Sequence, residues 1–396
     1  MDDLGVGARI ARARRLARLT QVQLAQKANV SLSLLRKVEQ GDRAATPALT
    51  AAAARVLGVS VGDLNGQPYE QEQGDAGAAH ATIPELRRAI VAYDDEPVTG
   101  PSSFGDLADA LDRVREGMRR ARYSDMTAEL PDVIRGLHQL ADDDLPGAQR
   151  EEVHSALAYA YSKAMLFAYQ YGYLDLAGLA AERCGWAADR SGDPIWPIAA
   201  EYNRALILLY SGAYAGGLRT IDRAYAASEQ LPTTPDLLAV RGALHLRGSI
   251  LSARALDRDT AESHLAEAGG VAAAIQGSRY SNYGTGFRPS NVDIHSVAVP
   301  VELSDGTTAL SRAERIHLAG SVAPSRAGHF YIDVSRAWLL HGNKAQAFRS
   351  LEQARMIAPE LTRNHPQVHE TLRVLAHTRR GTDKLAHFAK WANVKI

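Results

Sequence analysis

The chain has 396 residues, more than a single hydrophobic core usually spans, so we expect at least two domains. Its 45 basic and 45 acidic residues give a formal net charge of zero, and its single cysteine, Cys184, excludes a disulfide within the chain and fits a reducing cytoplasm. No signal peptide is visible, and no run of about 18 apolar residues occurs, which excludes a membrane-spanning helix.

The balanced charge hides an asymmetry along the chain. Residues 1–66 carry ten Lys and Arg against five Asp and Glu, so this segment has a net charge of +5 and the rest of the chain −5. A small basic unit attached to a mildly acidic body predicts a polyanionic partner for the small unit alone.

Two short helices joined by a tight turn are predicted over residues 20–41. Thr20 and Gln23 have the spacing of a capping box at the start of the first helix. Asn29 stands at the turn, where a left-handed backbone is required and Asn tolerates it better than most residues. Ser31 then caps the second helix. Each position meets a different physical demand, which favours a helix-turn-helix.

This segment resembles the phage-repressor-like regulators, also called the xenobiotic-response-element type. The resemblance covers about residues 7–65. It includes the preceding helix, the Thr46-Pro47 start of a fourth helix and a fifth helix beginning in the LGVSVGDL stretch at 57–64. It implies that residues 1–66 form a five-helix DNA-binding domain.

The family places its second motif helix in the major groove of DNA. By position, the resemblance therefore assigns seven DNA-contacting residues: Gln21, Leu32, Ser33, Arg36, Lys37, Gln40 and Arg43. Lys37 could read guanine, Ser33 either base and Leu32 a thymine methyl, and Arg36 faces the bases or the nearby backbone. The remaining three, Gln21, Gln40 and Arg43, suit phosphates. The alternatives are that Lys37 is only a solvated charge and that Leu32 packs against its own domain or a partner.

A linker is predicted over residues 67–83, which are poor in large apolar side chains and rich in Gly, Gln and Ala. Residues 84–396 are amphipathic at helical spacing almost throughout, with no sustained period-two alternation, so we expect an all-α fold. A second loop is predicted at 94–103.

The helical region is expected to be a repeat array, because Gly or Asp turns recur 40, 45, 49 and 36 residues apart. Each turn is followed by a small residue that would let two helices approach closely. The pairs are Gly172 with Ala177, Gly212 with Gly217, Asp257 with Ala261, Gly306 with Ala309, and Gly342 with Ala347. This spacing is similar to the roughly 34 residues of a tetratricopeptide repeat, and the alternative is an irregular helical bundle.

A repressor-like head on a helical-repeat body resembles the layout of the peptide-sensing quorum regulators of Gram-positive bacteria. That resemblance implies a sensor and dimerisation domain whose inner helices bind a small molecule or a peptide. Within it, segment 278–295 interrupts the helices with Gly, Pro and aromatic residues, which suits ligand capture, although it could also be a packed connector. The predicted ligand-binding residues are Tyr202, Asn203, Arg247, Tyr283, Phe287, Asn291, His295 and Arg336, with Asp333 and Trp338 as further candidates.

Enzymatic motifs are missing from the sequence. GTGFRPSN lacks the ending of a phosphate-binding loop, and the four-residue spacing of His365 and His369 has no HExxH motif beside it. We therefore expect no catalytic activity, no cofactor and no metal.

Two functions remain open at this point. The first is a cytoplasmic, ligand-responsive transcription regulator that binds double-stranded operator DNA as a homodimer. The second is an adaptor whose repeats bind a protein while the head tethers it to DNA. An enclosed cavity would favour the first, and an open apolar groove the second.

Overall fold

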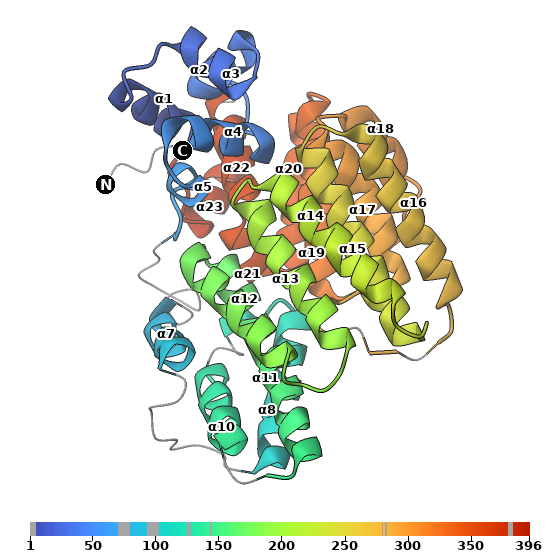
Figure 1. The fold of residues 1–396 in the computed structure, drawn as a ribbon. Coiled ribbons are helices and arrows are strands. Elements are labelled where there is room, and N and C mark those ends of the chain that lie inside the picture. The colour runs from blue at the N-terminus through green and yellow to red at the C-terminus, as the bar shows by residue number, and fades with distance from the viewer. Residues whose placement is uncertain are drawn as a thin grey trace.

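The structure is a computed structural model that describes residues 5–69, 80–92, 103–124, 128–142, 145–278, 280–281, 283–378 and 383–396. The described residues form helices and their connections, and none of these residues lies in a strand, which confirms the predicted all-α fold (Figure 1). Residues 94–102 of the predicted loop and most of the predicted linker lie outside the described residues, and Ser103 caps the helix that follows the loop.

The N-terminal head contains five short helices around a small apolar core. They are α1 (Val6–Leu16), α2 (Gln21–Ala28), α3 (Leu32–Glu39), α4 (Pro47–Leu57) and α5 (Val61–Asn65). The capping box of Thr20 and Gln23 is present, and Asn29 ends α2 in the left-handed region with φ 54°. The local signals of the sequence therefore set these helix ends.

In the described part of the body, three helices come first, five consecutive helix pairs follow, and three more helices end the array. The first three are α7 (Ile83–Val91), α8 (Phe104–Arg119) and α10 (Leu130–Asp142). The pairs are α11 (Gly147–Gln170) with α12 (Leu174–Ala188), α13 (Ile195–Tyr210) with α14 (Tyr214–Glu229), α15 (Pro235–Arg254) with α16 (Arg258–Ala274), α17 (Pro289–Glu302) with α18 (Gly306–Ala313), and α19 (Pro324–Leu340) with α20 (Lys344–Ile357). The last three are α21 (Pro359–Asn364), α22 (Pro366–Thr378) and α23 (Asp383–Trp391).

Small residues allow the two helices of each pair to pack closely. Four of the five predicted turn residues lie between the helices of a pair, the fifth, Gly306, is the first residue of α18, and the small residue that follows each turn is buried. These residues are Ala177, Gly217, Ala261, Ala309 and Ala347. Gly217 also allows α14 to approach the next pair, because an added Cβ would lie 2.6 Å from the Leu251 side chain of α15, so no larger residue fits there without a shift.

The array curls until its end meets its beginning. The carboxylate of Glu360, at the start of α21, accepts hydrogen bonds from the backbone N–H groups of Tyr123 and Ser124 at 2.9 and 3.0 Å. It also accepts a hydrogen bond from the hydroxyl of Tyr171, at the end of α11, at 3.1 Å. Contacts across more than 180 residues of sequence thereby fix the curvature of the body.

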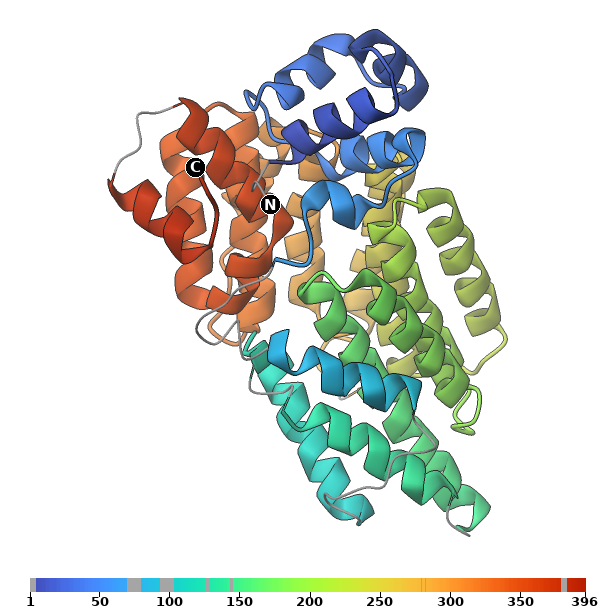
Figure 2. The same cartoon turned by 90° about the vertical axis from the view of Figure 1, so that its left-hand side faces the viewer.

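The head lies over one end of this array, beside the C-terminal helices (Figure 2). The N–H of Val6 donates to Glu370 of α22 at 3.2 Å, and Asp42 lies 3.4 Å from the imidazole of His377. Tyr69, in the predicted linker segment, stacks on His369 with ring centroids 4.1 Å apart. The head is therefore docked on the body through side chains from both.

The single cysteine, Cys184, is fully buried. This burial raises the pKa of its thiol to about 12, so the thiol stays protonated at neutral pH.

Among the helices described, none is both long enough and apolar enough to cross a bilayer.

Candidate functional site

The first candidate site is the outer face of α3. Leu35 and Val38 are buried in the core of the head, and the hydroxyl of Ser31 accepts the N–H of Leu34 at the start of the helix. The opposite face is left open to solvent. It carries the exposed side chains of Ser33, Arg36, Lys37 and Gln40, and Arg43 is exposed just beyond the helix. These five predicted DNA-contacting residues therefore lie where a nucleic acid could reach them.

Gln21 and Leu32, the other two predicted contacts, are held by the head itself. The Gln21 amide donates to Glu39 at 2.8 Å, and the guanidinium of Arg14 binds the same carboxylate at 2.7 and 2.9 Å. Burial opposes ionisation of Glu39, but these partners together lower its pKa, so the carboxylate stays charged. Leu32 is half-buried and packs against the core of the head. Both residues therefore help to position α3.

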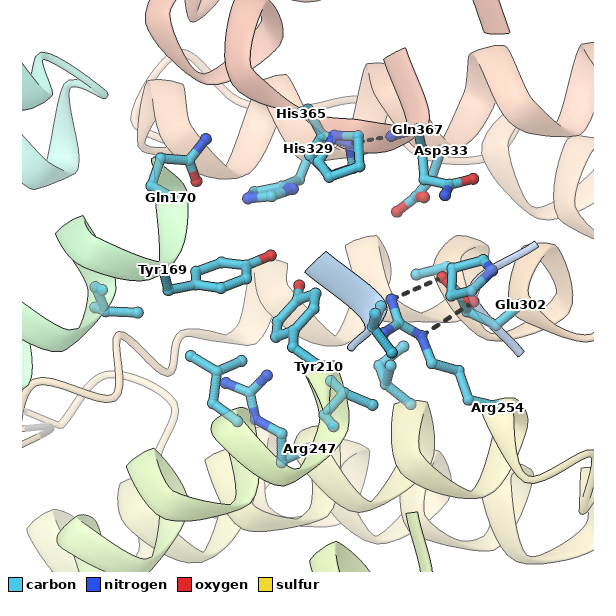
Figure 3. Close-up of a pocket in the computed structure, with 18 of the residues that line it drawn as sticks. Tyr169, Gln170, Tyr210, Arg247, Arg254, Glu302, His329, Asp333, His365 and Gln367 are labelled. Atoms are coloured by element: carbon cyan, nitrogen blue, oxygen red, sulfur yellow. Dashed lines mark hydrogen bonds and ion pairs between the residues drawn. The ribbon is translucent and has the colours of Figure 1, made fainter. Parts of the chain in front are cut away.

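The second candidate site is a cavity of about 230 Å³ inside the curled array. The first helix of each pair lines it, namely α11, α13, α15, α17 and α19. The second helices of the pairs lie outside, and only Leu174 and Tyr214, at the starts of α12 and α14, reach the cavity. The curvature of the array thus gathers residues that lie far apart in the sequence around one space (Figure 3).

The head forms one wall of this cavity. Thr50 and Ala51 of α4 line it, as do Asn65 of α5 and Gln67. The close approach depends on glycine at a turn of the body, because an added Cβ at Gly212 would lie 2.6 Å from the Cβ of Ala51. Gly212 also has φ 73°, a conformation that favours glycine.

A similar contact occurs at Gly172, where φ is 84° and an added Cβ would lie 2.7 Å from the Cβ of Gln67. The hydroxyl of Tyr214 donates to the carbonyl of Pro47 at 3.3 Å. A molecule in the cavity would therefore contact both the head and the body.

A buried ion network occupies one side of the cavity. Glu302 binds Arg254 at 3.2 Å and Arg336 at 3.0 Å, and Arg336 also binds Asp333 at 2.9 Å. Burial disfavours the charge of Glu302, but the two guanidiniums lower its pKa to about 2. For Asp333 burial dominates and raises the pKa to about 6. Two of the cavity arginines are thus neutralised by two carboxylates.

Three histidines on the cavity wall are uncharged at neutral pH. Burial, reinforced by the nearby Arg326, lowers the pKa values of His295 and His329 to about 3. Burial and His329 likewise keep the pKa of His365 well below its usual range. The Nδ1 atom of His295 lies 2.7 Å from the Asn291 carbonyl, so it carries the proton and Nε2 can accept a hydrogen bond.

The structure brings four of the eight predicted ligand-binding residues to the cavity and leaves four elsewhere. Tyr202, Arg247, His295 and Arg336 line it. Asp333 lines it as well, whereas Trp338 does not.

The other four candidates support the fold around the cavity. The Asn203 amide is buried against the sulfur of Cys184 at 3.5 Å, and Tyr283 donates to Asp193 at 2.7 Å. Phe287 is 1% exposed and fills the space left by Gly242, whose added Cβ would lie 2.4 Å from the ring. The buried Asn291 donates to the Gly286 carbonyl at 2.9 Å, which holds the loop before α17.

The cavity also contains residues that the sequence analysis did not predict to bind a ligand, among them Tyr169, Tyr210, Arg254, Glu302, Arg326, His329 and His365. A signal for several of them was present. Polar residues recur seven positions apart on the first helix of three pairs, as Arg247 with Arg254, His295 with Glu302, and His329 with Arg336. Seven residues are nearly two helical turns, so each pair points the same way.

Comparison with known proteins identifies the head only. Residues 6–65 match the family described as "Helix-turn-helix domain", and the chain matches none of the curated proteins with which it was compared. Together with the geometry of α2 and α3, the match identifies this segment as a helix-turn-helix domain, the kind of domain with which transcription regulators bind DNA. Among the described residues no cluster of three or more His, Cys, Asp or Glu could hold a metal ion.

Proposed function

We propose that this protein is a sequence-specific transcription regulator of the cytoplasm whose helical-repeat body binds a small molecule or peptide and thereby modulates operator binding. The DNA-binding half of the proposal is supported by the helix-turn-helix match and by the exposed Ser33, Arg36 and Lys37 on α3. Arg and Lys side chains on a recognition helix suit guanine edges and phosphates. We assign the base contacts to Lys37 and Ser33.

One observation carries the regulatory half. The head supplies one wall of the central cavity, through α4 and α5, and the body supplies the others. A ligand that contacts both would bind the docked arrangement better than an undocked one, and such a difference in affinity is what shifts a population. About 1.4 kcal/mol of coupling changes operator affinity tenfold.

We further propose that the regulator acts as a homodimer through its body. One helix-turn-helix head covers a single half-site, whereas specific operators usually require more interface. Docking of the head on the body through Val6 and Glu370 would then fix the distance between the two heads. A ligand that alters docking would alter the match to half-site spacing. Footprints with two half-sites, together with a dimer in sedimentation, are expected.

The decisive experiment measures DNA binding and ligand response on the full chain. Duplexes are selected from a random library, footprinted, and titrated with and without a small-molecule fraction and, separately, a protein fraction of a host extract. Failure to select any sequence would contradict the DNA-binding assignment. The response is the ratio of operator affinities with and without the fraction.

A cavity-filling variant locates the response. Ala298→Phe places a ring in the cavity, whereas Ala273→Phe places one on the exposed surface of α16. We expect the ratio of operator affinities to become one in Ala298→Phe and to keep its wild-type value in Ala273→Phe. An equal ratio in both variants would place the effector elsewhere. A response carried only by a protein in the extract would favour the adaptor function instead.

A further inference from the structure

The four arginines that line the cavity fall into two groups. Arg254 and Arg336 are bound to Glu302, and Arg336 also to Asp333. Arg247 and Arg326 have no carboxylate partner among the residues the structure describes, although both face the cavity. The described lining therefore carries two cations that its own acids do not balance.

Arg247 is positioned by an aromatic ring and leaves hydrogen-bonding capacity unused. Its guanidinium lies over the ring of Tyr202, 4.5 Å from the centroid. Its Nε atom is buried and makes no hydrogen bond. In Figure 3 the side chain extends from α15 into the space below Tyr169 and Tyr210. A buried donor without a partner is unusual in a folded protein and marks a position where a ligand atom could satisfy it.

Arg326 reaches the same region from α19. An added Cβ at Gly286 would lie 3.1 Å from its Nη2 atom, so the loop leaves room for the guanidinium. The positive charges of the two arginines change the pKa of a neighbouring tyrosine. Burial raises the pKa of Tyr202, but Arg247 and Arg326 outweigh it and lower the value overall. A field that favours the anionic form of a buried phenol also favours an anionic ligand.

One part of the cavity suits an apolar ring. Tyr169 and Tyr210 lie with ring centroids 4.0 Å apart, and Leu206, Leu209 and Ile250 complete an apolar surface. An apolar cavity of about 150 Å³ holds one benzene molecule. The volume of about 230 Å³ therefore accommodates one ring with an acidic substituent, and it is small for an extended peptide.

We propose that the cavity binds a small organic anion, with a carboxylate or phosphate held between Arg247 and Arg326 and a single ring packed against Tyr169 and Tyr210. The inference rests on the proposed effector function and specifies the chemical class of the effector. Arginine suits this role because its planar donors match both acidic groups and it remains charged when partly buried.

The test uses defined probes with the full-length protein. Benzoate and phenyl phosphate are titrated against it by calorimetry, beside benzamide as the neutral counterpart and acetate and inorganic phosphate as anions without a ring. We expect at least one of the two ring anions to bind at least about tenfold more tightly than benzamide and than its own ringless anion. Benzoate alone would indicate a carboxylate effector, and phenyl phosphate alone a phosphate ester.

Substitutions assign the arginines. Arg247→Gln and Arg326→Gln should each lower the affinity for the ring anion about tenfold or more, because each removes a charge-assisted contact. Arg349→Gln, on the exposed face of α20, is the matched control and should leave the affinity unchanged. The two cavity variants should also keep the melting temperature of the ligand-free protein, since neither leaves a carboxylate unpaired. Arg254→Gln should lower it, because Glu302 then loses a partner.

Equal binding of benzamide and benzoate, or full affinity in both cavity variants, would overturn the proposal. So would the absence of binding by both ring anions. None of these results bears on whether the protein selects an operator or responds to a host extract, so failure of the anion site is distinguishable from failure of the proposed function.

Discussion

Glu370 supplies the helix cap that Gly5 cannot. Gly5 precedes α1 and has no side chain to accept a hydrogen bond, and the carboxylate of Glu370 accepts the N–H of Val6 at 3.2 Å instead. A negative charge at a helix N-terminus is favourable because it satisfies free N–H groups and complements the helix dipole. The first helix of the head is therefore completed by a residue 364 positions later in the chain.

Removal of this cap should loosen the head. We expect Glu370→Ala to destabilise the docked α1 by about 1–2 kcal/mol, the usual cost of a lost cap. Hydrogen exchange of α1 amides should become faster, and Glu370→Gln, which keeps an acceptor, should have a smaller effect. Glu229→Ala, at an exposed position in α14, should change nothing. Unaltered exchange in Glu370→Ala would show that the contact does not hold the head.

A larger side chain at Ala51 should separate the head from the body. Ala51 faces Gly212 rather than the core of the head, so Ala51→Leu should leave the head folded. Overpacking of such a contact costs about 1–3 kcal/mol. Small-angle scattering should show a larger radius of gyration, whereas Gln26→Leu, at an exposed position on α2, should not. Identical scattering of wild type and Ala51→Leu would contradict the tight docking.

Lys37 should contribute to sequence-specific binding. It is exposed on α3, and loss of a bidentate base contact costs about 1–3 kcal/mol. We expect Lys37→Ala to weaken binding to the selected operator by that amount in a fluorescence anisotropy titration. Lys384→Ala removes an exposed lysine of the body, on α23, and should retain full affinity. If the two variants bound the operator equally well, Lys37 would be only a solvated charge.

Lys163 should make stability depend on pH above neutrality. It is 4% exposed and donates to the Gly284 carbonyl at 3.0 Å. Burial, reinforced by Arg115 and Arg326, lowers its pKa to about 7 from an ordinary value of 10.5. Between these values the unfolded chain binds the proton and the folded chain does not, so stability rises with pH by at most about 1.4 kcal/mol per unit.

The test compares Lys163→Met with the exposed Lys384→Met by chemical denaturation from pH 7 to 9. Lys163→Met should lose the rise in unfolding free energy over this window, and Lys384→Met should keep it. Parallel pH profiles for wild type and Lys163→Met would show that the lysine remains charged when folded.

Phe287 should stabilise the fold and should not contact a ligand. Its ring is buried in an apolar cluster with Ala243 and Leu246 and does not line the cavity. Truncation of such a side chain costs about 3–5 kcal/mol, so Phe287→Ala should lower the melting temperature markedly. Phe287→Leu fills more of the space and should lose less. A normal melting temperature for Phe287→Ala would point instead to a surface role.

Local chemistry made the head and the helix ends predictable. Thr20, Asn29 and Ser31 act on backbone groups within a few residues, so their effect can be read without knowledge of the fold. The turns at Gly172 and Gly342 were predictable for the same reason, because the backbone there requires positive φ.

The ligand residues were harder to predict because aromatic and amide side chains serve cores as well as sites. Phe287 and Asn291 look like binding residues in an unusual loop, yet one fills a gap left by Gly242 and the other bonds its own loop. Arg326 lay in no motif, and its place beside Tyr202 depends on α13 and α19 lining the same cavity.

The sequence by itself determined the helical class, the helix-turn-helix and the pairing of neighbouring helices, because these depend on periodicity, caps and turns that act over short distances. The tertiary structure alone decided that the array curls until Glu360 meets Tyr171, and that the head closes one side of the resulting cavity. Those features arise from contacts between residues far apart in the chain, where small packing rotations add up over many helices.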